Sequence, residues 1–151
     1  MFVDKKLKEW LKRYLPANIF ATIMVLIVSW IVILLTKNYI LAAFIASIVE
    51  TITYYSFILV RDVIYTRKLL ISKSRKYTFS SFLKNVRNLF LEFGVGEVLD
   101  TFIVRPFFLY FTPRLVRNYT IGLIIGKYVS DLIFYIPTII SYEMRKKHLK
   151  D

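Results

Sequence analysis

Long apolar runs alternate with short polar turns along the chain. Two uninterrupted runs occupy residues 16–36 and 39–60, and two further runs, punctuated by charged residues, occupy 88–111 and 119–142. A helix of about 20 apolar residues crosses the roughly 30 Å hydrocarbon layer of a bilayer. The pattern therefore predicts an all-α polytopic membrane protein with four transmembrane helices, arranged as two hairpins in a single membrane domain over residues 1–151.

The segments that lead into the two hairpins are basic and amphipathic. Over residues 1–15, apolar side chains recur at helical spacing with lysines between them, which is typical of a helix lying on the inner leaflet. Residues 62–87 form a predicted basic cytoplasmic loop, whose latter part is apolar along one helical face and predicts a second interfacial helix. We expect the first apolar run to be retained as a span, since no small-residue cleavage site follows Thr36.

Positive charge is distributed unevenly among the segments between the runs. The net charge is +12, and 17 of the 22 Lys and Arg residues lie before the first run, between the second and third, or after the fourth. The positive-inside rule then places both termini and the central loop in the cytoplasm, with the protein in the inner (cytoplasmic) membrane. This distribution favours attraction to anionic lipid of the inner leaflet over nucleic-acid binding.

Charged residues inside the predicted spans mark the candidate site. Each costs about 2.5–3.5 kcal/mol at the bilayer centre on insertion scales, so such residues are kept with a partner or a task. Glu50 lies midway along the second run and Asp131 midway along the fourth, each followed by a tyrosine four residues later. The predicted substrate- or ion-binding residues are Glu50, Tyr54, Glu97, Asp100, Arg105, Lys127, Asp131 and Tyr135.

The spacing of these charges predicts some of their interactions. Lys127 and Asp131 are four residues apart, so they can pair along one helix. Pro106 lacks the amide hydrogen that a helix would require and predicts a kink beside Arg105. In a bundle, four acids would face two bases, and this excess calls for protons, bound cations or water. We expect Arg105 and Lys127 to form a layer that meets an anionic group.

Two further patterns concern packing and symmetry. Asn38–Tyr39 recurs as Asn118–Tyr119, eighty positions later, which is a weak indication of a parallel repeat of the hairpin. Gly122, Gly126 and Ser130 share one helical face at intervals of four, a spacing that lets helix backbones approach closely. This face is a candidate for the contact between subunits of a homo-oligomer.

The ends of the second and fourth runs resemble a known sequence motif. They read Tyr-Tyr-Ser-Phe over residues 54–57, through to Arg61, and Phe134-Tyr135 through to Tyr-Glu-Met-Arg over residues 142–145. With four spans and a basic central loop, the chain resembles the GtrA-like family of small membrane proteins. That resemblance implies a role in moving polyprenyl-phosphate-linked sugars across the membrane. The asparagine of the family's motif has no counterpart here, so the resemblance implies only Arg61 and Arg145 as phosphate contacts at the inner surface.

Two classes of function follow from these observations. The first is a small integral membrane transporter or flippase-like protein with a charged midplane site, for a lipid-linked or small anionic substrate with proton or cation coupling. The second is a non-catalytic accessory subunit of a larger membrane complex, so that the expected partner is a second copy or another membrane protein. An enzyme is disfavoured, since the chain has no cysteine and its only histidine, His148, lies in the charged tail. No cofactor or metal is expected.

Overall fold

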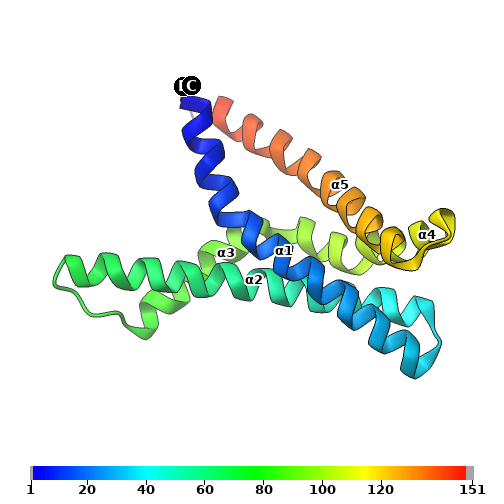
Figure 1. Ribbon diagram of the computed structural model, residues 1–151. Helices are drawn as coiled ribbons and strands as arrows, with labels where there is room; N and C mark the ends of the chain where they lie inside the picture. The colour runs from blue at the N-terminus through cyan, green and yellow to red at the C-terminus, as the bar shows by residue number, and fades with distance from the viewer. Residues whose placement is uncertain (1, 149–151) are drawn as a thin grey trace. The chain divides into compact units, whose positions relative to one another are not determined.

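The computed structural model describes the backbone of residues 2–148 and the side chains of residues 8, 11–12, 14–90, 94 and 96–136. Within that range the chain is helical and contains no strand, which confirms the predicted all-α class (Figure 1). The elements, in chain order, are α1 (Phe2–Thr36), α2 (Tyr39–Ser72), α3 (Phe79–Leu99), the π-helix η1 (Asp100–Val104), α4 (Arg105–Val116) and α5 (Tyr119–His148).

Three helical segments are long and apolar enough to cross a membrane. They are Tyr14–Thr36, Tyr39–Ser72 and Tyr119–Ile136, of 23, 34 and 18 residues. These segments correspond to the first, second and fourth predicted spans. Many of their large apolar side chains are exposed, as with Leu35 at 79% and Leu132 at 64%. Extensive apolar exposure is rare on soluble monomers and is the surface that lipid tails would cover.

The third predicted span, 88–111, is divided into several helical segments. Gly94 has φ 49° and ψ −147°, a left-handed backbone conformation that interrupts α3 and that only glycine adopts readily. Six residues later the π-helix η1 begins, and α4 follows it with Pro106 in its first turn. Glycine and proline are the usual causes of sharp helix bends, and both are present here.

The predicted central loop is shorter than the sequence pattern indicated. Helix α2 continues to Ser72, so the 12 residues 61–72 are a rigid extension of the second span. Helix α3 begins at Phe79, which confirms the helix predicted in the latter part of 62–87. Residues 2–15 are helical as predicted, but they run directly into the first span, because α1 passes through Pro16 without interruption.

The chain divides into two compact units, and each draws on both α1 and α2. Unit 1 comprises Met1–Met24 and Val49–Gly94. Within it, the guanidinium of Arg61 donates a hydrogen bond to the Lys12 carbonyl. Farther along α2, the Thr66 hydroxyl donates to the side-chain carbonyl of Asn85 at 3.1 Å, so α2 and α3 are tied together by a polar contact.

Unit 2 comprises Val25–Ile48 and Val95–Asp151, and it contains the apolar core. The core residues come from α1, α2, α4 and α5: Val25, Ala43, Ala46, Leu109 and Leu123. Two asparagines begin helices in the same way, since Asn38 accepts from the amide of Leu41 at 3.1 Å and Asn118 from the amide of Ile121 at 3.1 Å. The Asn-Tyr recurrence in the sequence therefore marks two equivalent helix N-caps.

The glycine face of α5 packs within the chain. A Cβ at Gly122 would lie 2.2 Å from Cα of Pro113, and a Cβ at Gly126 would lie 2.6 Å from the Phe108 carbonyl oxygen. These distances leave no room for a side chain, so α4 and α5 touch backbone to backbone. Helix α4 thus occupies the face that was a candidate for a contact between subunits. Small residues permit close approach to any neighbouring helix, whether it belongs to the same chain or to another.

Candidate functional site

Five ionisable side chains of unit 2 form a buried network around Arg105, which we call the ion-pair network. Asp131 bridges the two cations of the network: one carboxylate oxygen lies 2.6 Å from Lys127 Nζ and the other 3.7 Å from Arg105 Nη2. Arg105 also pairs with Asp100 and lies 3.8 Å from Glu97. The Lys127 and Asp100 side chains are only 1% and 2% exposed. Charges buried to this degree are stable only when paired.

The π-helix explains how Arg105 reaches Asp100. In an α-helix, residues five apart point about 140° away from each other at 3.6 residues per turn. Over Asp100–Val104 the helix widens, and the amide of Arg105 donates to the Asp100 carbonyl, a bond that spans five residues. A π-turn holds more residues than an α-turn, so residues five apart are rotated less from each other, and the side chains of Asp100 and Arg105 come close enough to pair. The widened turn therefore creates the central ion pair of the network.

A serine from α2 supports the widened turn. In the five-residue pattern, the Thr101 carbonyl would accept from the amide of residue 106, but that residue is proline and has no amide hydrogen. The Ser47 hydroxyl donates to this carbonyl instead, at 2.6 Å. Ser47 is fully buried, as is usual for a polar group whose hydrogen bond replaces one to water. The Thr101 hydroxyl in turn donates to Glu97 at 3.4 Å.

Replacing Ser47 by Ala is expected to lower the free energy of unfolding by about 1–3 kcal/mol, because it leaves the buried Thr101 carbonyl without its donor. The matched control is Ser56→Ala, since Ser56 is an exposed serine on the same helix. Equilibrium unfolding in mixed detergent micelles, followed by circular dichroism, measures both changes. Equal stability of the two variants would contradict the proposed support.

The charges of the ion-pair network do not cancel. Among the side chains that the structure describes, these pairs join three carboxylates to two cations, so the five groups carry a formal charge of −1 when all are ionised. Glu97 makes the longest of these ion pairs, at 3.8 Å, and its side chain is the most exposed of the five, at 13%. Of the three carboxylates, Glu97 is therefore the one held least closely by the two cations.

The structure places the remaining predicted site residues as follows. Glu50 and Tyr54 belong to unit 1, where Glu50 is buried at 2% exposure and the ring of Tyr54 contacts that of Tyr55 edge to face. Arg61 is exposed and bonded to the Lys12 carbonyl. Tyr135 is 37% exposed and packs against Phe134. The Arg145 side chain lies outside the residues whose side chains the structure describes.

Three features of the site can be compared with the sequence predictions. The pair of Lys127 and Asp131 confirms the prediction from their spacing. Arg105 and Lys127, which we expect to meet an anionic group, each pair with a carboxylate of their own unit. Ser47 was not predicted. Pro106 is the sequence signal for such a contact, because its missing amide hydrogen leaves a carbonyl that needs another donor, but it does not identify which residue supplies that donor.

The fold and the site together define a class: an all-helical chain with apolar helices of membrane-spanning length and a buried ion-pair network built from α3, η1, α4 and α5. Comparisons with protein-family models, with curated proteins and with solved structures find no match to the chain. The resemblance to the GtrA-like family consequently stays a prediction from the sequence.

Proposed function

We propose that the chain is a small integral membrane transporter or flippase-like protein whose ion-pair network couples substrate movement to a proton or monovalent cation. The observation that carries this proposal is the surplus carboxylate: three acids surround two bases in a buried site. A purely structural network would be expected to balance its charge, since an unbalanced buried charge is costly. A single exchangeable cation would restore neutrality.

The backbone around the network supports movement as well as binding. The Gly94 interruption precedes the network, and η1 lies within it, next to Pro106. Interrupted helices at membrane depth are typical of transport sites, where they line a polar interior. In this proposal α3, η1 and α4 together form the third of four crossings, with both termini and the basic segments on the cytoplasmic side of the inner membrane.

The substrate class remains that expected from the sequence, a lipid-linked or small anionic molecule. Because Arg105 and Lys127 already hold carboxylates, an anion would reach them only by displacing one. Uptake of a proton by the network would weaken that competition, since a neutral carboxyl group no longer holds the cation. Coupling between proton and anion would arise directly from this exchange.

Proton and sodium fluxes into proteoliposomes test the proposal. Under an imposed potential, the wild-type protein is expected to carry protons or sodium faster than empty liposomes do. Glu97→Gln balances the network at two acids and two bases, so it should abolish the flux while the thermal midpoint stays within a few degrees. Asp62→Asn is the matched control, since Asp62 lies in unit 1 and should leave the flux intact. A wild-type flux equal to that of empty liposomes would contradict the proposal.

The second candidate, an accessory subunit of a membrane complex, is favoured by one observation. Both cations of the ion-pair network are paired within the chain, as in a network that serves only to hold helices together. In that case the wild-type flux would equal that of empty liposomes. Loss of the network would instead show as loss of the assembled complex, or of a homo-oligomer, in native gels of solubilised membranes.

A further inference from the structure

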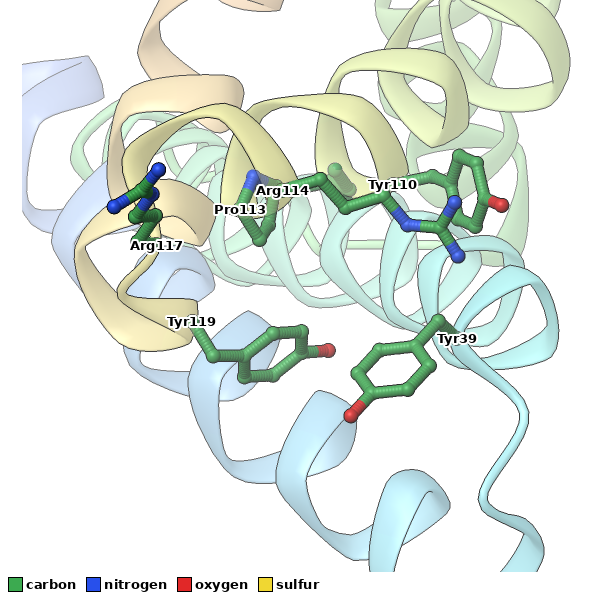
Figure 2. A pocket seen from close by; sticks show the side chains of 7 residues that line it. Tyr39, Tyr110, Pro113, Arg114, Arg117 and Tyr119 are labelled. Atoms are coloured by element: carbon green, nitrogen blue, oxygen red, sulfur yellow. The ribbon is translucent and has the colours of Figure 1, made fainter.

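A pocket of about 340 Å³ lies at the end of unit 2 where α4 ends and α2 and α5 begin (Figure 2). Three tyrosines and two arginines line it, together with Leu109 and Pro113: Tyr39, Tyr110, Arg114, Arg117 and Tyr119. Arg105 precedes Arg114 by nine residues of α4, which is about 13 Å along a helix. The pocket is therefore separate from the ion-pair network.

The positive charge of the pocket has no acidic counterpart nearby in the sequence. No Asp or Glu lies among the lining residues, and residues 101–130 contain none. Residues 10–49, which supply Tyr39, contain none either. Unlike Arg105, Arg114 and Arg117 therefore line a space whose charged lining residues are all positive. Such a surface attracts anions.

The geometry of the lining favours one kind of anion. The guanidinium carbon of Arg114 lies 4.0 Å from the centre of the Tyr110 ring, a cation–π contact that restrains the guanidinium group at the pocket. The rings of Tyr39 and Tyr119 meet edge to face at 5.8 Å, and Figure 2 shows them together across the pocket from Arg114. Phenol hydroxyls and a fork of guanidinium donors match the several oxygens of a phosphate.

We propose that this pocket binds the phosphate group of a phosphate ester, with Arg114 contacting the phosphate oxygens, Arg117 adding positive charge to the lining, and the tyrosine rings covering the ester's carbon atoms. Leu109 and Pro113 supply further apolar surface for those atoms. The ester can be a phospholipid headgroup or a small soluble phosphate. In either case the position of the two arginines, on the side of the chain poor in positive charge, is explained by a ligand and not by topology.

Trp30 provides a built-in reporter of the pocket. Its ring lies 5.4 Å from that of Tyr119, and its indole N–H donates to the Thr120 hydroxyl at 3.2 Å. In a Trp10→Phe background Trp30 is the only tryptophan, so its fluorescence reports on Tyr119 and the start of α5. The protein is placed in phosphatidylcholine nanodiscs and titrated with glycerol 1-phosphate in one arm. In the other arm, the fraction of phosphatidylglycerol in the nanodisc is increased.

We expect a saturable fluorescence change in at least one arm, which also distinguishes a soluble ester from a headgroup. Arg114→Gln should raise the dissociation constant, or the half-saturating lipid fraction, about tenfold, as the loss of a charged hydrogen bond implies. Lys37→Gln is the control: it removes the same charge at the neighbouring turn, but Lys37 does not line the pocket. Circular dichroism verifies that each variant is folded.

Three results would overturn the proposal. They are the absence of a saturable change in both arms, equal weakening by Arg114→Gln and Lys37→Gln, and equal responses to glycerol 1-phosphate and to sodium chloride of the same ionic strength. Arg114→Lys gives a second reading, since it keeps the charge but loses the planar fork, and it should bind more weakly than wild type. None of these substitutions changes a residue of the ion-pair network. The binding test therefore stands whether or not the protein carries an ion flux.

Discussion

Replacing Arg105 by Gln is expected to lower the free energy of unfolding by about 3–5 kcal/mol, because it leaves buried carboxylates without their common cation. Arg105 pairs with Asp100 and lies within 3.8 Å of Glu97 and 3.7 Å of Asp131. Its side chain is 6% exposed, so water cannot replace the lost interactions. Equilibrium unfolding in mixed micelles of a mild detergent and sodium dodecyl sulfate measures the change.

Two further variants make this expectation specific. Arg114→Gln removes an exposed arginine from the same helix and should change the unfolding free energy by less than about 1 kcal/mol. The double variant Arg105→Gln with Asp100→Asn removes one charge of each sign and should recover most of the loss. An Arg105→Gln variant as stable as Arg114→Gln would show that the network does not hold unit 2 together.

Replacing Gly122 by Ala is expected to lower the free energy of unfolding by about 3 kcal/mol or more, at the upper end of overpacking costs. The new methyl group would lie 2.2 Å from the backbone of Pro113, and backbone cannot move aside as a flexible side chain does. Helices α4 and α5 would have to separate, so Lys127 and Asp131 on α5 would move away from Arg105 on α4.

Gly96→Ala is the matched control for this substitution. A Cβ at Gly96 would meet only a ring carbon of Phe134, at 3.4 Å, which is close to ordinary van der Waals contact. It should therefore be neutral or slightly stabilising, as Ala is preferred to Gly in a helix. If both variants unfold at the same detergent composition, the close packing of α4 against α5 is not a determinant of stability.

The sequence allowed the apolar helices and one ion pair to be predicted, because both depend on local spacing. An apolar run of sufficient length identifies its own helix, and Lys127 and Asp131 are four residues apart whatever else the chain does. The asparagines at 38 and 118 are local in the same sense, since an N-cap bonds to amides three residues away. These features needed no knowledge of how the helices pack.

The features that could not be predicted depend on contacts between helices. Pro106 indicated a disturbance, but a proline can produce a kink, a break or a π-helix, and only the packing selects among them. The small-residue face at Gly122 and Gly126 is the same for a contact within the chain and for one between subunits. Ser47 is 54 residues from the carbonyl it serves, so no local pattern connects them.

The length of α2 has a consequence for the cytoplasmic charge. Its 34 residues extend about 51 Å at 1.5 Å per residue, whereas a bilayer with its headgroups is about 40–45 Å thick. If α2 crosses the bilayer near its normal, its last turns therefore extend beyond the headgroups into water and carry Arg67 and Lys68 with them. Their height above the lipid is then set by helix length, and thinner or thicker membranes would expose these charges to different degrees.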